Sequence, residues 1–328
     1  MSYVQPIVIK VQVVFERDIF IKDYTAKLVK SLLISGNPRL EEVFARGKNL
    51  PPKPIHITPL YTTSLSKDGK KKRETVYTKY IPKDSTAKPP KVSRLRPVRI
   101  ETGKTYFFYI GTNLSLLSDV LLGLSNIGKF VFGKWVVDVE NISYEIHYID
   151  LEKESEEITN ILLKNIGRNN KERLQVKIVF ESPTLLKDPL AIMRKKKKKL
   201  LLPLPEAIFS VPMFMMLIDK GRFRSSVFLR CMRYLKSVFD IPYTVLKTVN
   251  LVWYVYDNEV LPAMIGYVKY FVDNQILQYV QSITKMKYNL DFMEILSKSI
   301  ILAQVYGVGD GRATGFGHIT IKMNTIQR

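Results

Sequence analysis

The sequence predicts an α+β protein made of two tandem ferredoxin-like domains of the βαββαβ, RRM-like type, with basic loop insertions. Three observations lead to this prediction. The chain has 328 residues, enough for two domains of ordinary size. Strand and helix patterns alternate in each half, and the second half opens with a strand pattern like that of the first. We place the first domain at 1–150, a linker at 151–172 and the second domain at 173–328.

The first half carries one full series of elements. A β-branched run that alternates along 6–16 predicts the opening strand. Residues 17–35 have the i, i+4 apolar spacing of a helix, which the Gly-Asn-Pro sequence at 36–38 would end. The series continues with a strand at 53–60, a strand at 104–112, an amphipathic helix at 114–126 and two strands joined near Gly133 within 129–149.

The second half repeats this order after a charged stretch at 151–172, which we interpret as the linker. Residues 173–183 have the pattern of the first strand. The rest of the series is predicted as helices around 212–239, strands at 244–257 and 260–273, a helix at 291–306 and a last strand at 317–323.

Two basic insertions interrupt the plan. Residues 61–100 contain twelve Lys or Arg and three acidic residues, and 194–199 reads RKKKKK. Runs of like charge repel one another and usually remain solvated, so the pattern predicts mobile basic loops suited to phosphate backbones. Tyr77 and Tyr80 in the first insertion would either stack on unpaired bases or lie in the strands of a hairpin.

Charge indicates the kind of partner. The formal net charge is +21 and the pI is near 9.7, so the surface attracts polyanions. Nucleic acid is the first expectation; an anionic membrane and a basic protein with no such partner are the alternatives. No stretch approaches the apolar length of a membrane-spanning helix and the start does not resemble a signal peptide, which predicts a cytoplasmic protein without a membrane partner.

Cysteine and histidine usage limits the chemistry. The single cysteine, Cys231, excludes an internal disulfide and a thiolate zinc site. The three histidines, His56, His147 and His318, lack the spacing of metal ligands. We therefore expect no cofactor, and catalysis, if present, that uses no metal or only carboxylate-bound ions.

A glycine-rich loop lies near the end of the chain. Residues 307–317 read GVGDGRATGFG, with five glycines in eleven positions, between the last predicted helix and the last strand. Bare backbone N–H groups can form an anion-binding concavity, to which Arg312 would add a fixed charge. The same glycines would also suit a turn that packs a helix closely against a sheet. The residues alone favour the two interpretations equally.

This loop resembles the signature of the RAMP superfamily of CRISPR-associated RNA-binding proteins, and most of all the endoribonuclease family that cuts CRISPR precursor transcripts within each repeat. Three further stretches resemble that family: KPIHITPL at 53–60, FGKWVVDVENISYEI at 132–146 and VFESPTLL at 179–186. The resemblance implies metal-independent cleavage, in which a 2′-hydroxyl attacks the adjacent phosphate and leaves 5′-hydroxyl and 2′,3′-cyclic phosphate ends. Many relatives use a histidine that is missing here between residues 30 and 52, so the chain resembles archaeal members without it.

The resemblance implies lysines as the catalytic groups. Lys27 and Lys30 lie at i, i+3 on the first predicted helix and Lys53 opens the next strand. Clustered lysines would stabilise the phosphorane and lower one another's pKa enough for proton transfer. Lys269 is our candidate for a basic residue from the second domain, and His56 is the alternative catalytic residue. A merely solvated lysine face remains the other interpretation.

Further residues are predicted to bind RNA because they are basic or belong to the glycine loop. These are Gly307, Gly309, Gly311, Arg312, Gly315, Gly317, His318, Lys322, Lys71, Lys72, Arg73, Arg194 and Lys195. The expected partners are CRISPR repeat RNA and an effector complex that receives the product RNA, with the protein as a monomer or homodimer. The alternative function is a non-catalytic RAMP subunit that coats guide RNA within such a complex.

Overall fold

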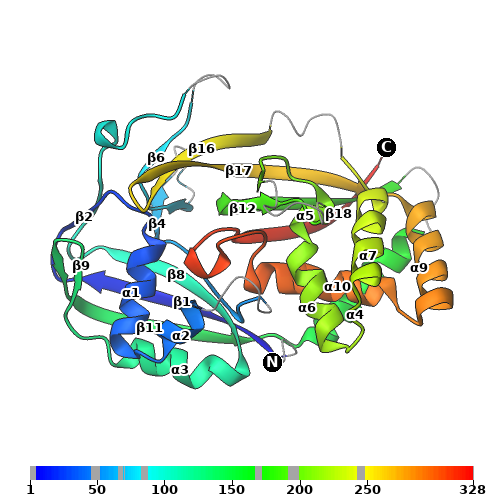
Figure 1. Cartoon of the computed structure of the whole chain (residues 1–328), viewed down its shortest axis with the longest axis horizontal. Helices are drawn as coiled ribbons and strands as arrows, with labels where there is room; N and C mark the ends of the chain where they lie inside the picture. Colours follow the sequence, from blue (N-terminus) through cyan, green and yellow to red (C-terminus); the bar gives the residue numbers. More distant parts are fainter. Residues whose placement is uncertain are drawn as a thin grey trace.

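Two antiparallel sheets form the frame of the molecule, one from each half of the sequence. The computed structural model describes residues 5–45, 52–65, 69, 71–82, 88–166, 172–190, 199–241 and 248–327. Figure 1 shows the two halves side by side, the first half on the left and the second on the right.

The first sheet has the strand order β11-β1-β8-β4-β5, and β3 also pairs with β8. Alternate residues of β1, from Ile7 to Phe15, are buried under helices α1 and α3. The elements of this half are β1 (Pro6–Phe15), β2 (Ile19–Ile21), α1 (Ala26–Gly36), α2 (Leu40–Ala45), β3 (Ile55–Ile57), β4 (Tyr61–Leu65), β5 (Lys71–Thr75), β6 (Lys79–Tyr80), η1 (Val92–Arg94), β7 (Val98–Ile100), β8 (Thr105–Asn113), α3 (Leu114–Ser125), β9 (Phe130–Phe132), β10 (Trp135–Val137) and β11 (Val139–Tyr148).

The second sheet has the strand order β18-β12-β17-β16-β6. Its elements are α4 (Leu151–Ile166), β12 (Glu172–Thr184), β13 (Leu186–Lys187), β14 (Lys199–Leu200), α5 (Pro205–Ile208), α6 (Ser210–Asp219), α7 (Ser225–Val238), β15 (Phe239–Asp240), β16 (Val249–Tyr256), β17 (Glu259–Val272), α9 (Asn274–Tyr288), α10 (Phe292–Tyr306), η2 (Arg312–Thr314) and β18 (Ile319–Gln327). Among the helices described, none has both the length and the apolar character needed to cross a membrane.

Both sheets follow the ferredoxin-like order, in which the fourth strand lies beside the first and the third lies between the first and the second. In the first half these strands are β1, β3 with β4, β8 and β11; in the second half they are β12, β16, β17 and β18. The predicted fold class, two tandem βαββαβ domains with insertions, is confirmed.

Three local predictions differ from the structure. The helix expected from residue 17 begins at Ala26, and the short strand β2 precedes it. The stretch expected as a linker, 151–172, contains α4, whose Leu151 and Leu162 are buried in the second core. Much of the insertion 61–100, expected as a mobile loop, forms strands: β4 pairs with β5, and β6 adds to the second sheet beside β16.

The glycine loop joins the two halves. Phe316 and Ala313 belong to the core of the first half, although they lie at the end of the sequence. The ring of Phe316 stacks on Tyr24 with centroids 4.6 Å apart, and the Tyr24 hydroxyl donates to the carbonyl of Gly315 over 2.9 Å. Gly315 has φ +97°, and a Cβ there would lie 2.1 Å from the Cβ of Ala26. The loop therefore needs glycine here for close approach to α1.

Two buried histidines lie at the same junction, one from each half. Nδ1 of His56 lies 2.8 Å from the carbonyl oxygen of Arg312, so this nitrogen carries the proton of the neutral ring. Nε2 of His56 lies 3.4 Å from Nδ1 of His318. Burial lowers the pKa of His56 to about 3. Burial, and then the nearby charges of His56 and Arg73, lowers the pKa of His318 well below its ordinary value.

Replacing Gly315 with alanine tests the closeness of the junction. We expect G315A to lower the free energy of unfolding by about 2–4 kcal/mol, since it adds a steric clash to an unfavourable backbone conformation. The matched control is G133A, which has φ +61° but open space around the added Cβ and should cost about 1–2 kcal/mol. Urea denaturation gives both values, and equal losses would contradict the close packing.

The histidine pair predicts a pH-dependent stability. An unfolded histidine takes up a proton near pH 6.5, whereas the folded pair remains neutral to much lower pH. Below pH 6.5 the unfolded state binds more protons, so the free energy of unfolding should fall by about 1.4 kcal/mol per pH unit for each histidine. Urea denaturation between pH 7.5 and 4.5 should show a shallower slope for the double variant H56Q/H318Q than for wild type. An unchanged slope would rule out the pair as the cause, and H147Q, at an exposed site, is the control.

Candidate functional site

The glycine loop is packed inside the molecule and forms no open cradle. Gly307, Gly315 and Gly317 are buried, while Gly309 and Gly311 are partly exposed. The guanidinium of Arg312 is also buried, with 7% of the residue exposed, and its Nη1 donates to the carbonyl of Tyr306 over 2.9 Å. The expectation that Arg312 projects from a surface cradle toward phosphates is therefore wrong. Of the two interpretations of this loop, close packing of helix against sheet describes the structure.

Lys27 is held by two carboxylates. Its Nζ lies 2.5 Å from Asp23 and also pairs with Asp257, at the turn between β16 and β17. The ammonium lies over the Tyr256 ring, 4.3 Å from its centroid. Although burial lowers the pKa of Lys27, its hydrogen bonds to Asp23 and Asp257 outweigh that effect and raise it. The charge of Lys27 is thus largely neutralised by these two carboxylates.

Of the three lysines predicted in the first half, Lys30 and Lys53 lie near one another, and we call these two the lysine cluster. Both lie against Phe44 of α2: Nζ of Lys53 donates to its carbonyl, and Nζ of Lys30 lies 5.3 Å from its ring centroid. Burial lowers the pKa of Lys53, and the charges of Lys30 and Arg312 lower it further. A lysine with a lowered pKa can exchange a proton more readily than an ordinary one.

The histidines are poorly placed for catalysis. His56 is 1% exposed and both its ring nitrogens face protein atoms at the junction, so it lies away from any surface that RNA could reach. His318 is 8% exposed and its ring stacks on Tyr109, with centroids 5.6 Å apart. The expectations that His56 acts as the alternative catalytic residue and that His318 touches RNA do not agree with this burial.

Three lysines form a row across the second sheet, on the face away from its core. Lys177 of β12 is paired in register with Lys269 of β17 on one side and with Lys322 of β18 on the other. We call these residues the lysine row. Like charges on directly opposed positions destabilise a sheet, and no ion pair recorded within the described residues involves any of the three. A polyanion lying on this face would relieve the repulsion.

The lysine row places Lys269 elsewhere than predicted and includes Lys177, which the sequence analysis did not identify. Lys269 was expected near the cut, but it lies on the open face of the second sheet, whereas Lys30 lies on a helix that covers the other face of the first. Lys177 was missed, although the strand pattern at 173–183 already placed it on the polar side of its strand. Only the register between distant strands brings it beside Lys269 and Lys322.

The predicted residues of the insertions differ in their placement. Lys71 and Lys72 lie in β5. Arg73 of the same strand pairs with Glu181 of β12 at 2.9 Å, and its guanidinium lies 5.5 Å from the ring centroid of Tyr109. Arg194 and Lys195 lie outside the described residues. Within the described ranges, no group of three or more His, Cys, Asp or Glu residues is arranged to hold a metal ion.

Comparison with known proteins adds the family context. Residues 7–79 match the family model described as the Cas6 N-terminal domain. A product complex of a Thermus thermophilus Cas6 aligns over 97% of this chain and 100% of that chain, with 12% identity and a TM-score of 0.58. A partial Cas6-RT-Cas1–Cas2 complex aligns over 98% of this chain and 47% of that chain, with 12% identity and a TM-score of 0.51. No curated protein matches the chain in sequence.

These findings confirm the resemblance seen in the sequence. The family model covers the first strand, the first helix and the lysine cluster, and the structural alignments extend over nearly the whole chain. Residues 7–79 are therefore similar to the Cas6 N-terminal domain, and across both halves the chain has the fold of the Cas6 structures that it matches.

Proposed function

We propose that the protein binds CRISPR repeat RNA and cleaves precursor transcripts within the repeat without a metal ion. The observation that carries the proposal is the lysine cluster: Lys30 and Lys53 meet beside Phe44 in the part of the chain that matches the Cas6 N-terminal domain. The lowered pKa of Lys53 supports a role in proton transfer. The net charge of +21 supports binding to a polyanion.

The chemistry assigns different tasks to the two lysines. The 2′-oxygen forms a bond to the adjacent phosphorus, the bond from phosphorus to the 5′-oxygen breaks, and a 2′,3′-cyclic phosphate remains. Lys53 in its neutral form takes the proton of the 2′-hydroxyl, and in its charged form it gives a proton to the departing 5′-oxygen. Lys30 stabilises the negative charge that develops on the phosphorane oxygens.

The lysine row would bind the backbone of the same RNA. Lys177, Lys269 and Lys322 present three positive charges on one open face. Lysines that neutralise phosphates release condensed counterions, which makes the affinity fall with salt. We also propose that the product RNA passes to a CRISPR effector complex, with this protein acting as a monomer or homodimer.

Cleavage of a repeat transcript in EDTA tests the proposed function directly. We expect one cut within the repeat, with a 2′,3′-cyclic phosphate on the upstream product and a 5′-hydroxyl on the downstream product. Gel mobility before and after treatment with phosphatase and kinase identifies these ends. Tight binding without a cut would instead favour the guide-coating RAMP subunit, and a cut that requires added metal would contradict the mechanism.

Single substitutions test the lysine cluster. We expect K30A and K53A each to lower the single-turnover cleavage rate about 100- to 1,000-fold, as loss of one transition-state contact does, while the Kd changes much less. K53R separates the two tasks of Lys53, because arginine keeps the charge but cannot lose its proton. Its cleavage rate should remain low if proton transfer is the task of Lys53.

Two variants serve as controls for this series. K285A removes an exposed lysine from α9, far along the chain, and should cleave like wild type. K27A removes a lysine whose charge is already neutralised by Asp23 and Asp257. It should therefore lower the cleavage rate less than K30A, the other substitution in α1. A loss in K27A as large as that in K53A would move the catalytic role to Lys27.

A further inference from the structure

The hairpin formed by β16 and β17 reaches from the second half of the molecule to α1 of the first half. At its tip the carboxylate of Asp257 pairs with Lys27, which lies 230 residues earlier in the sequence. Figure 1 shows this end of the two yellow strands above the first turn of α1, drawn in blue. The contact therefore joins the second sheet to the helix that also carries Lys30 of the lysine cluster.

The hairpin tip has a backbone conformation that suits its two residues. β16 ends at Tyr256 and β17 begins at Glu259, so Asp257 and Asn258 form the turn between them. Their φ angles are +52° and +61°, as in a type I′ turn. Aspartate and asparagine adopt this left-handed conformation more readily than other residues with a side chain. Replacing Asp257 with asparagine therefore keeps the turn and removes only the charge.

The base of the tip is fixed, whereas its carboxylate is accessible. The ring centroids of Tyr254 and Tyr256 lie 4.9 and 5.8 Å from that of Phe316 in the glycine loop. The side chain of Asp257, by contrast, is 72% exposed. An ion pair with so exposed a partner contributes little to stability and is exchanged at low cost. The tip thus holds a carboxylate beside Lys27 on which the stability of the fold does not depend.

The charge at this contact is opposite to that of the whole chain. Asp23, one helical turn before Lys27, pairs with the same ammonium, so two carboxylates surround one cation and leave a net charge of −1. The chain as a whole has a net charge of +21. Lys30 lies one turn further along α1, so a phosphate that approached it would be repelled by the carboxylate of Asp257.

We propose that Asp257 occupies the place of an RNA phosphate at Lys27, and that a bound transcript displaces this carboxylate. Carboxylate and phosphate oxygens both accept hydrogen bonds from an ammonium, so the two groups compete for Lys27. The contact lowers the affinity of α1 for polyanions in general. It opens when other contacts hold a phosphate at high effective concentration beside Lys27. The identity of the RNA as CRISPR repeat rests on the proposed function.

A binding experiment tests this competition without cleavage. The probe is repeat RNA with every 2′-hydroxyl methylated, and the Kd is measured at low salt. We expect D257N to lower the Kd about 2- to 5-fold, the range of a single exposed charge pair, because Lys27 is then more available to phosphate. The double variant K27A/D257N should bind like K27A, since the gain requires Lys27. Unchanged or weaker binding by D257N, or a gain that persists without Lys27, would overturn the proposal.

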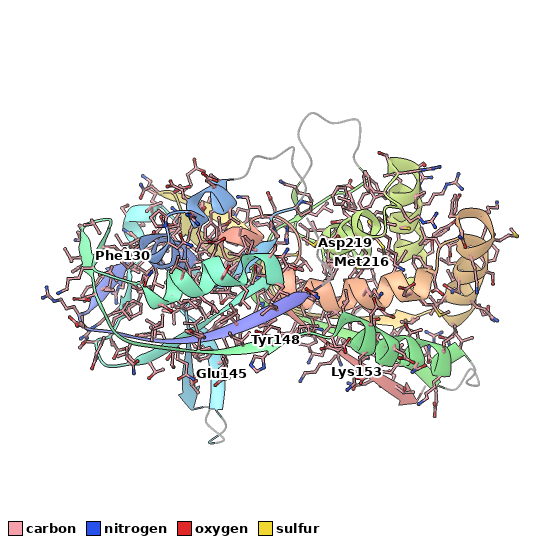
Figure 2. All side chains as sticks on the ribbon, turned by 90° about the horizontal axis from the view of Figure 1, so that it is seen from below. Phe130, Glu145, Tyr148, Lys153, Met216 and Asp219 are labelled. Carbon is pink, nitrogen blue, oxygen red and sulfur yellow. The ribbon has the colours of Figure 1, made fainter. Side chains whose placement is uncertain are left out.

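A matched variant controls for the change in net charge. E157Q removes one negative charge from an exposed position of α4. Figure 2 shows Lys153 of the same helix in the right half of the molecule, away from the blue α1 on the left. E157Q should bind like wild type, and a gain equal to that of D257N would overturn the proposal.

Two further measurements separate competition from a structural role. The urea midpoint of D257N should match that of wild type, because an exposed ion pair contributes little to stability. A clearly lower midpoint would make Asp257 a structural residue and overturn the proposal. The gain in affinity should also diminish as salt is raised, since salt screens exposed charges. A gain that does not change with salt would contradict an electrostatic competition.

Cleavage of the unmodified repeat by wild type is measured in parallel. Coupling between D257N and K27A in the Kd without any cleavage would defeat the proposed function alone. Cleavage without this coupling would defeat the competition at Lys27 alone.

Discussion

The insertion of the glycine loop into the first half of the molecule is the contact on which the rest of the structure depends. The loop places Phe316 against Tyr24 and brings the carbonyl of Arg312 to His56, so the end of the chain completes the core of its beginning. Strand β6 makes the reverse exchange, because it leaves the first half and pairs with β16 of the second. The core of the first half therefore includes buried residues of the second half, while the second sheet includes a strand from the first.

The junction also influences side chains on both of its sides, the helix side of the first sheet and its open face. On the helix side, the charge of the buried Arg312 helps to lower the pKa of Lys53. On the open face of the first sheet, His318, which follows directly after the loop, stacks on the ring of Tyr109. A loop that makes no surface cradle for phosphates therefore still contributes to the site, through the proton affinity of one side chain and the orientation of another.

The sequence predicted what local periodicity determines and missed what distant contacts determine. Alternation along 6–16 and 173–183 identified the strands that open each domain, because one face of each is buried. The partner of Lys27, Asp257, lies 230 residues away, and the lysine row depends on the register of three strands, so neither follows from spacing. The acidic residues on the outer face of α4 led us to predict a linker where the chain forms a packed helix. Glycines at 307–317 suit an anion site and close packing equally, and only the neighbouring atoms distinguish the two.

The stability of the junction and the ability of Lys53 to accept a proton both increase as pH rises toward neutrality. A neutral histidine pair is stable only where the unfolded chain would not take up protons, which means near pH 6.5 and above. A lysine accepts a proton only in its neutral form, and the fraction in this form increases as pH rises. A lowered pKa shifts this increase toward neutral pH. Because the charge of Arg312 lowers the pKa of both His56 and Lys53, the same residue links the protonation of the junction to the chemistry beside it. A change that displaced the loop would therefore be expected to weaken the structure and raise the pKa of Lys53 together.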